Sequence, residues 1–453
     1  MEDKEKSIDE LIKLIKSHQS LSDDDYKMLQ KHLDPKQHEV NNKSVRPDRE
    51  LKEVYEDEET GQEKTRTSGF YKVNRITHDR IKYIVNKAVA FACGNPLEVS
   101  YSGKNVDAVR EEIEEVMTAN KESSLNRRFC RALFTFREAA EIWYLEEDGN
   151  IRCHIVSPMY GDTLYPIIDR RRKMQGFAYS NKFMQDGVEI EELAFYTRES
   201  TRVFQCVGGN WKETKESITN IWEKIPVCYT NQEEADFEGV LPSIYRLERS
   251  SSNLADSVDD NAFPDKLFKG DFKGQIETPG KGGKYTADGE ADIKVVESAQ
   301  GSNLIELDID ENKNIVNSLS QTPDLSLENL KGLGIQSGAA MDRLFIDARL
   351  KVEDKREYLD EHYTRRYNIV KTMVCKKRGI DPDSIQIEVN VIPYVPTDYY
   401  AEIEKILALR SFMPQRYVIG EFKKRIDPSI DVDEIMQWIE EEKKFEFGGS
   451  LME

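Results

Sequence analysis

The longest hydrophobic pattern in the chain predicts one long helix. Its apolar residues recur at steps of three, four or seven: Phe345, Ala348, Val352, Leu359, Tyr363, Val370 and Val374. This spacing places them on one face of an α-helix for about eight turns. We expect the helix to open at Ser337-Gly338 and to span about 60 Å at roughly 1.5 Å per residue, which is longer than a small domain is wide. Such a helix is suited to hold other parts of a molecule in position.

A turn-rich segment comes directly before this helix. It runs from Thr322-Pro323-Asp324 through Gly332-Leu333-Gly334 to Gln336, and a second helical pattern near Glu311–Gln321 precedes it. The sequence therefore predicts a loop between two helices. Glycine adopts backbone conformations that other residues avoid, so Gly332 and Gly334 are the expected hinges of that loop.

The first half of the chain predicts an α+β region. A short amphipathic helix within residues 1–20 is followed by polar, proline-containing sequence to about residue 60, which we interpret as a partly mobile arm. The next helix ends at Gly94 and Pro96, a strong stop signal. From Ala140 to Tyr229 the period changes to two, which indicates strands, with a hairpin turn at Asp148-Gly149.

Helical patterns return in the second half. Residues 237–262 carry an apolar stripe, residues 263–300 are rich in glycine and lysine, and a short strand is predicted at Ile385–Val389. The last fifty residues predict three helices, at about 398–411, 415–426 and 431–443. The stripe of residues 237–262 consists of Phe237, Leu241, Ile244, Leu247, Leu254 and Val258.

Composition narrows the classes of protein. The 453 residues are 38% hydrophobic and 33% charged, with a net charge of −20. The six cysteines are scattered, which favours reduced thiols over a disulfide framework or a zinc knuckle. No run approaches 18 apolar residues and the N-terminus has no signal-peptide core, so we expect no membrane association and no conventional export. The acidic balance argues against gripping duplex DNA from outside, but not against surrounding DNA that must slide.

Three residue patterns suggest ligand-binding sites, but their spacing does not match the spacing that each site requires. Residues 278–284 resemble a phosphate-binding loop, but Lys284 is followed by Tyr285 and no apolar strand precedes the segment. Residues 308–319 resemble a calcium loop, but Lys313 stands at the position that needs glycine, so a helix N-terminus capped by Asp308 or Asp310 explains the acids better. The six histidines have no zinc-binding spacing. We therefore expect no cofactor, no metal and no catalytic residue.

Two basic clusters have structural explanations. Arg170-Arg171-Arg172-Lys173 is expected to be a solvated turn or to pair with a neighbouring subunit, although contact with DNA is an alternative. Arg365-Arg366 are expected to pair with acids on their own helix, Glu361 with Arg365 above all.

Three motifs follow one another along the chain. They are Asn74-Arg75-Ile76 with Lys87 through Gly94-Asn95-Pro96, Ser252-x-Leu254-Ala255-Asp256, and Thr322-Pro323-Asp324 with Ser337-Gly338-Ala339-Ala340. Together with the order of the elements, they resemble the portal proteins of long-tailed double-stranded-DNA bacteriophages over roughly residues 65–440. Phe91 replaces the tyrosine of the first motif, and residues 275–291 are richer in glycine and lysine than the family pattern.

The resemblance implies an elongated α+β subunit with a wing, a helical stem, a small α/β clip and a helical crown, twelve of which close a ring. It implies this division: N-terminal arm 1–60, first part of the wing 61–236, stem helix 237–262, clip 263–307, second stem helix 308–321, tunnel loop 322–336, long helix and second part of the wing 337–397, crown 398–453.

The resemblance further implies a channel at one capsid vertex through which double-stranded DNA is packaged and ejected. The subunit would reside in the virion, and in the host cytoplasm during assembly. Implied partners are further copies of the chain, the DNA, the terminase large subunit, head-completion or adaptor proteins, and the major capsid and scaffolding proteins. Expected DNA contacts on the tunnel loop are Asn329, Lys331, Gly332, Gly334 and Gln336, and expected terminase contacts on the clip are Lys273, Lys281 and Lys284.

Two other classes remain open from the sequence. A non-catalytic neck or scaffold protein without a DNA channel would share the helices and the acidity, but it would not need the loop between Thr322 and Ser337. A packaging enzyme would need nucleotide-binding motifs and clustered acidic metal ligands, which the sequence lacks.

Overall fold

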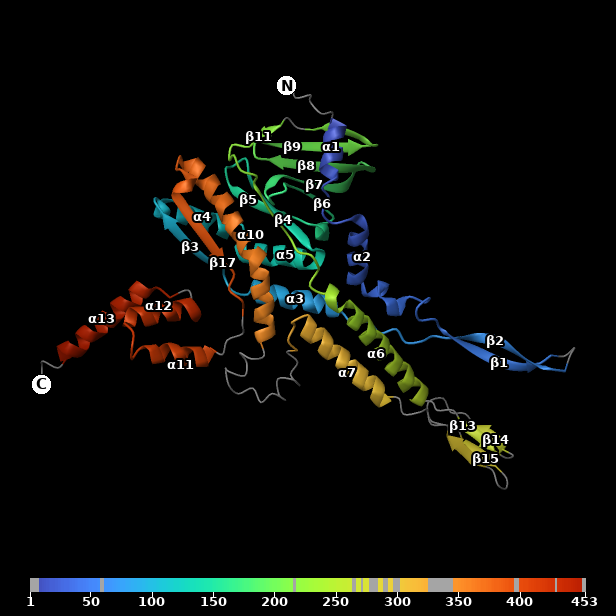
Figure 1. Cartoon of the computed structure of the whole chain (residues 1–453). Coiled ribbons are helices and arrows are strands. Elements are labelled where there is room, and N and C mark those ends of the chain that lie inside the picture. Colours follow the sequence, from blue (N-terminus) through green and yellow to red (C-terminus); the bar gives the residue numbers. More distant parts are fainter. Residues whose placement is uncertain are drawn as a thin grey trace.

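The computed structural model describes residues 8–57, 61–214, 217–262, 266–269, 272–276, 284–287, 292–295, 302–324, 345–394, 399–427 and 430–449. The molecule is elongated (Figure 1). Packed sheets and helices occupy one end, a pair of long helices leads away from them to a group of short strands, and the C-terminal helices are set to one side.

The N-terminal segment is more ordered than the predicted arm. It forms α1 (Ile8–Lys16), α2 (Asp23–Leu33), two 3₁₀ turns (Pro35–Gln37 and Glu39–Asn41) and strand β1 (Arg49–Glu56), which pairs with β2 (Glu63–Tyr71). Ser22 caps α2 by accepting a hydrogen bond from the Asp25 N–H. Residues 1–60, interpreted as an arm, include helix α2, whose buried Leu29 belongs to the main core.

Three helices and a small sheet form the base of the main core. The helices are α3 (Arg80–Ala92), α4 (Val106–Ala119) and α5 (Glu122–Phe136). Strand β3 (Glu98–Gly103) pairs antiparallel with β17 (Ile385–Asn390), which follows a 3₁₀ turn at Pro382–Ser384. This pairing joins segments almost 300 positions apart in the chain. One face of α3 is buried in this core: Ile81, Ile84, Val85, Ala88 and Phe91.

Two antiparallel sheets stand above this base. The first has the order β12-β4-β5, from β4 (Glu138–Leu145), β5 (Ile151–Val156) and β12 (Val227–Asn231). The Asp148-Gly149 turn between β4 and β5 is confirmed, with Gly149 at φ 85°. The second sheet has the order β10-β9-β8-β7-β6, with β11 (Ile218–Thr219) on β9. Its other strands are β6 (Thr163–Ile168), β7 (Met174–Gln185), β8 (Val188–Thr197), β9 (Ser200–Val207) and β10 (Asn210–Glu213).

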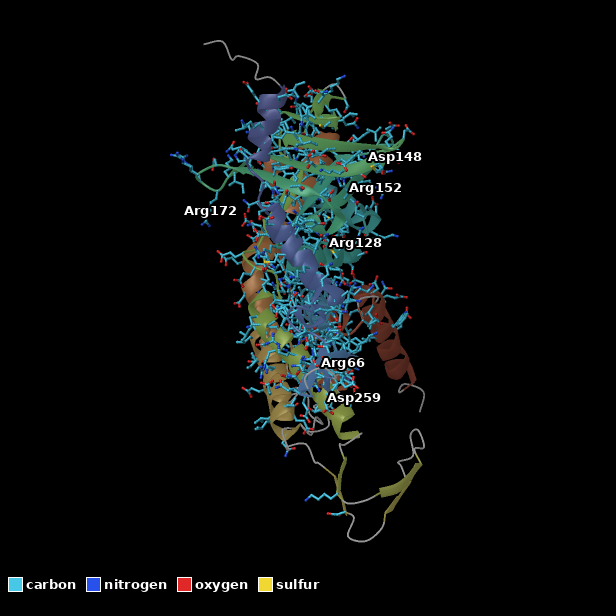
Figure 2. The ribbon with its side chains drawn as sticks, turned by 90° about the vertical axis from the view of Figure 1, so that its right-hand side faces the viewer. Arg66, Arg128, Asp148, Arg152, Arg172 and Asp259 are labelled. Carbon is cyan, nitrogen blue, oxygen red and sulfur yellow. The ribbon has the colours of Figure 1, made fainter. Side chains whose placement is uncertain are left out.

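The basic cluster at Arg170–Lys173 forms the exposed turn between β6 and β7. The Asp169 carboxylate accepts hydrogen bonds from the backbone N–H groups of Arg171 and Lys173, which fixes the turn. Figure 2 shows Arg172 on a loop that projects from the sheets on the side opposite to Asp148. The prediction of a solvated turn is confirmed for the subunit.

The helix pair that leaves the core consists of α6 (Leu241–Ala262), preceded by a 3₁₀ turn at Glu238–Val240, and α7 (Ser302–Leu319). Helix α7 begins before residue 308, the predicted start, so Asp308 lies within the helix and caps nothing. Its carboxylate instead accepts hydrogen bonds from Arg246 and Ser250 of α6. Val258, predicted on the buried stripe of α6, is 59% exposed because the far end of α6 extends beyond the core.

Four short strands lie beyond this pair. Strand β13 (Lys266–Lys269) pairs with β16 (Asp292–Val295), and β14 (Phe272–Ile276) pairs with β15 (Lys284–Ala287). In the described part of residues 263–301 the regular elements are therefore strands, where a small α/β unit was expected.

The long helix α10 runs from Ile346 to Arg378 and ends at Gly379, which has φ 69°. Every residue of the predicted apolar stripe, from Phe345 to Val374, is at most 2% exposed. The stripe is therefore confirmed, whereas the predicted opening at Ser337-Gly338 lies outside the described residues.

The predicted pairing of Arg365 and Arg366 along the helix was wrong. Arg365 donates to the Val227 carbonyl and Arg366 to Glu141, because α10 packs against β4 and β12.

Three helices close the chain: α11 (Tyr399–Leu409), α12 (Gln415–Arg425) and α13 (Val432–Gly449). They match the three predicted helices, although α13 continues further than expected. Among the described helices, none combines the length and the apolar character that crossing a bilayer requires. The predicted α+β class is confirmed.

Candidate functional site

The candidate site is the junction where the chain leaves α7 and returns to α10, because both ends of the predicted loop are fixed here. At the first end, the Thr322 N–H donates to the Asn317 carbonyl over 2.9 Å, after Gln321 turns the backbone with φ 52°. Thr322 is 2% exposed, and its hydroxyl donates to the Ser320 carbonyl over 3.2 Å. The chain therefore enters the loop from a buried, hydrogen-bonded position.

The second end is held by aromatic packing. Phe345 precedes the first turn of α10, is 2% exposed and packs against Phe91 of α3 with ring centroids 5.7 Å apart. Tyr83, also on α3, donates its hydroxyl to the Pro323 carbonyl at 3.5 Å. Helix α3 thus contacts both ends of the loop.

An ion cluster between Asp236 and α10 strengthens this junction. The Asp236 carboxylate is 1% exposed and lies 3.1 Å from Lys351 Nζ and 2.7 Å from Lys355 Nζ. Burial alone would raise the pKa of Asp236, but the two lysines outweigh it and the pKa is lowered. Lys351 also donates to the Ser320 carbonyl over 3.0 Å, so one side chain connects α10, the end of α7 and the segment before α6.

A shallow groove of about 280 Å³ opens over this cluster. Its lining comes from the end of α7, the start of α10 and the segment after β12. The lining residues include Gln232, Asp236, Gln321, Lys351, Lys355 and Tyr358. The groove holds no nucleophile with a base, and in the described part of the chain no three His, Cys, Asp or Glu side chains are grouped so as to hold a metal ion. The contacts at this junction join the end of α7 to the start of α10.

A second buried network ties α10 to the sheets. The Arg366 guanidinium is fully buried and donates to Glu141 of β4, with Nε 2.8 Å from Oε2. It also donates to the Asn126 side chain of α5 over 2.5 Å. Burial opposes ionisation of Glu141, but Arg366 and His362 lower its pKa to about 2. Helix α10 is therefore held at two places on its inward face, near its start by Lys351 and Lys355 and beyond its middle by Arg366.

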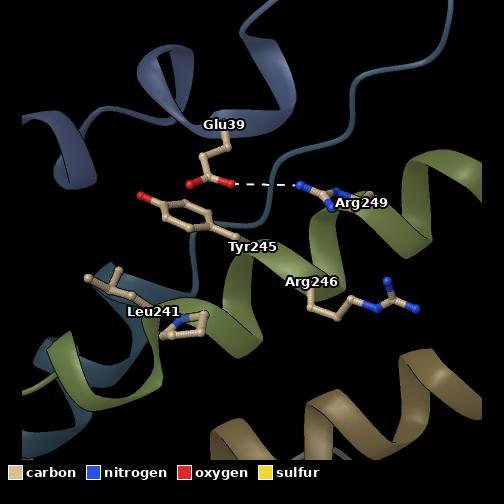
Figure 3. A pocket seen from close by; sticks show the side chains of 6 residues that line it. Glu39, Leu241, Tyr245, Arg246 and Arg249 are labelled. Carbon is tan, nitrogen blue, oxygen red and sulfur yellow. Dashed lines mark ion pairs between the residues drawn. The ribbon is translucent and has the colours of Figure 1, made fainter. Parts of the chain in front are cut away.

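The N-terminal segment is fastened to α6 by a third network. His38 Nδ1 lies 2.7 Å from Glu248, and both side chains are at most 2% exposed. Arg46 and Asn74 converge on Asp256, with the Arg46 pair at 2.6 Å. Figure 3 shows an open pocket of about 480 Å³ beside these contacts, where Glu39 faces Arg249 of α6 at 3.8 Å. These contacts make the N-terminal segment part of the structural frame around α6.

The residues predicted to contact DNA, Asn329, Lys331, Gly332, Gly334 and Gln336, all lie outside the described residues. Of the predicted clip residues, Lys281 also lies outside them. Lys273 lies in β14 and Lys284 in β15, two strands that pair antiparallel. The structure describes the contacts on either side of the predicted loop, at Thr322 and Pro323 and from Phe345 onward. These contacts are called the frame below.

Sequence reasoning missed the buried ionic side chains that build this frame. Lys351 and Lys355 are four residues apart, next to the apolar residues Ala348, Val352 and Leu359, so they lie close to the buried face of α10. That position was a usable signal. Asp236 and Glu141 gave none, because their partners are distant in the sequence.

Comparison with known proteins identifies the family. The sequence profile of the family described as "Phage portal protein, SPP1 Gp6-like" matches residues 12–445, almost the whole chain. Comparison with curated proteins gave no match.

Similar solved structures include a chain in the virion of a native gene transfer agent particle, at 11% identity and a TM-score of 0.43, covering 74% of this chain and 87% of that one. A chain in the neck of an empty particle of this kind gives 11% identity and a TM-score of 0.39, covering 74% and 86%. At these scores the family assignment rests on the sequence profile. By that match over residues 12–445, the chain belongs to the SPP1 Gp6-like phage portal proteins.

Proposed function

We propose that this chain is the subunit of a ring of twelve copies that forms the DNA channel at one vertex of a phage capsid. In this ring the sheets and helices around α10 form the wing, α6 and α7 form the stem, β13 to β16 belong to the clip, and α11 to α13 form the crown. Membership of the portal family supports this assignment. The observation that carries it is the double anchoring of the loop between Asp324 and Phe345, because a channel needs a contact loop on a fixed support.

In the proposed channel the loop contacts DNA only weakly. Within the tunnel loop, residues 322–336, Lys331 is the one cation and would approach a phosphate, with Asn329 and Gln336 as neutral partners, while Gly332 and Gly334 allow the loop to bend. The net charge of −20 on each copy disfavours a deep binding minimum for the duplex. Contacts to six or more phosphates would make binding tight and strongly salt-dependent, which translocation must avoid. Screening limits this repulsion to about 8 Å at physiological salt, so it acts only where the bore is narrow.

The clip is the proposed docking site of the terminase large subunit during packaging, and of head-completion or adaptor proteins afterwards. Lys273, Lys281 and Lys284 are its proposed contacts. The ring would sit in the virion beside the major capsid protein, after assembly with scaffolding protein in the host cytoplasm. In this proposal the subunit catalyses no covalent reaction.

The alternative is a neck or scaffold protein without a DNA channel. It would share the acidic surface and the long helices, but the rigid frame around residues 325–344 would then have no purpose. The two functions differ in what the purified protein forms.

Negative-stain microscopy and light scattering of the purified full-length chain test the proposal. We expect rings with a central hole at micromolar subunit concentration. Particles with the 52.4 kDa mass of one chain, at the same concentration and over a range of salt, would contradict it. Closed particles without a hole would favour the neck or scaffold function.

A further inference from the structure

The hairpin of β1 (Arg49–Glu56) and β2 (Glu63–Tyr71), called the ribbon below, is exposed to solvent in the isolated subunit. Among the described strands, β1 and β2 pair only with each other, and the described residues of both are exposed apart from the half-buried Gly69. A lone two-stranded hairpin is marginally stable in water at best. The ribbon nevertheless carries four large apolar side chains at the surface: Leu51 (50% exposed), Tyr55 (36%), Phe70 (64%) and Tyr71 (37%).

The base of the ribbon is fixed to the far end of α6. Arg49 lies 3.4 Å from Asp256, and the Asn74 side chain, just after the ribbon, donates to Asp259 over 2.7 Å. Figure 1 shows the ribbon projecting to the side of α6. The base of the ribbon is therefore fixed, while its large apolar side chains remain exposed to solvent in the subunit.

Helix α7 carries a second exposed apolar patch. Leu304 and Leu307 are 71% and 66% exposed, and their spacing of three places them on one side of the helix. The contact of Asp308 with Ser250 sets the register of α7 against α6, so Leu304 lies level with the end of α6 where the ribbon is attached. In the same subunit α6 stands between the ribbon and α7 (Figure 1), so the two patches do not cover each other.

The charges of the two surfaces are complementary. In the base half of the ribbon, residues 49–53 and 66–72, four cations outnumber two acids. On α7 the two leucines lie among the exposed acids Glu306, Asp310 and Glu311. Only Asp310 of these is seen paired within the helix, with Lys313 at 3.4 Å.

We propose that the base half of the ribbon docks on α7 of a neighbouring copy of this chain. Each copy supplies one ribbon and one α7 surface. A contact between two different patches, repeated head to tail from copy to copy, can close a cyclic ring. The inference rests on the proposed ring and adds the contact that joins adjacent stems. The ribbon lies level with the stem, which favours a second copy over a capsid protein as the occupant.

Photo-crosslinking in the full-length protein tests this contact directly. A benzoylphenylalanine probe replaces Phe70, and the subunits are mixed from normal and ¹⁵N-labelled preparations so that crosslinks between copies can be identified by mass. We expect crosslinks between copies that end on residues 302–319. The same probe at Tyr160, which is exposed on the wing, serves as the control and should not reach these residues.

The possible outcomes distinguish a failure of the ribbon–α7 contact from a failure of ring formation. Rings whose Phe70 probe reacts only within its own chain, or with any segment other than α7, would overturn the inference and leave the ring intact. A probe that reaches capsid protein in assembled particles, in place of α7, would also overturn it. An absence of rings in microscopy would overturn the proposed function together with this inference.

A variant provides a second measurement. L304E/L307E should raise the subunit concentration needed for half-maximal ring assembly by about tenfold or more, because two apolar contacts are lost at the interface. V207E, which alters a half-exposed wing residue, is the control. Circular dichroism that matches the wild-type spectrum shows that the subunit is folded, and unchanged assembly of that folded variant would refute the contact.

Discussion

At the scale of single residues, buried charges determine how firmly α10 is held. Arg366 and Glu141 are both fully buried and come from segments more than 200 positions apart. Removing one partner of such a pair leaves the other charge buried and uncompensated, which costs far more than the pair itself contributes. The pair therefore makes the docking of α10 on β4 specific.

Replacement of Arg366 tests this role. R366M should lower the free energy of unfolding by about 3–5 kcal/mol, because the buried Glu141 would lose its guanidinium partner, and His362 at 3.5 Å compensates its charge only when protonated. R128M, which alters an exposed arginine on α5, should have little effect. Urea unfolding followed by circular dichroism measures both variants. The double variant E141Q/R366M should recover part of the loss, and equal losses in the single and double variants would argue against a coupled pair.

A second buried acid predicts a dependence of stability on pH. Glu138 accepts hydrogen bonds from Ser20 and from Tyr229, the latter over 3.0 Å, and burial raises its pKa to about 7. Asp162 lines the same small hollow, and burial raises its pKa to about 6. The folded protein therefore holds protons that the unfolded chain, with carboxyl pKa values near 4, releases. Stability should fall as pH rises through about 4.5 to 7 and remain at the lower level above that.

The variant E138Q isolates the contribution of Glu138. It stays neutral, so it should be more stable than wild type at pH 8 by up to about 3 kcal/mol, and the difference should vanish near pH 4.5. Thermal unfolding at several pH values measures this difference. E147Q, at an exposed position in the β4–β5 turn, should show no such trend. An E138Q advantage that does not change with pH would contradict the argument.

At the scale of elements, the structure fixes the two positions between which the proposed tunnel loop lies. Helices α3, α7 and α10 meet at the junction, and Lys351, Asp236 and Phe345 fix its two ends. In the proposed function, a change in the conformation of the tunnel loop need not disturb either helix. This separation allows the loop to be tested apart from the fold.

The variant G332P/G334P should block DNA packaging while capsids still incorporate the ring. Proline fixes φ and removes the backbone N–H, so it stiffens the proposed hinges. G332A/G334A retains both N–H groups and should interfere less. Ring yield and packaged DNA are measured together. Normal rings with normal packaging would reject the hinge role, and a loss of rings would indicate that residues 332–334 form a structural turn.

At the scale of the whole molecule, function is distributed along an elongated subunit. The strands β13 to β16 lie at the far end of the stem, away from the wing (Figure 1). A partner can therefore dock there without contacting the main core. This arrangement suits a motor that binds and leaves during assembly.

Removing the clip lysines tests this docking. K273Q/K281Q/K284Q, or deletion of residues 275–291, should leave ring formation intact and abolish stimulation of the terminase ATPase. The matched control K104Q/K182Q/K212Q removes three exposed lysines from the wing region. Steady-state ATPase rates with purified rings provide the measurement. Undiminished stimulation by the clip variants would show that the motor docks elsewhere.

The sequence by itself determined the elements whose pattern is local. The stripe from Phe345 to Val374, the turn at Asp148-Gly149 and the C-terminal helices follow from periods of 3.6 and 2 and from turn chemistry. The ordered motifs also indicated the family. These signals need only neighbouring residues, so they are readable without a fold.

Only the tertiary structure decided the long-range contacts. The pairing of β3 with β17, the burial of α2 and the partners of Arg366, Asp236 and Asp256 depend on which distant segments meet. A buried charge and a surface charge look alike in a sequence, and Asp308 was mistaken for a helix cap for this reason. The difference is physical: local patterns reflect the geometry of one element, whereas an ion pair in the core reflects the packing of several.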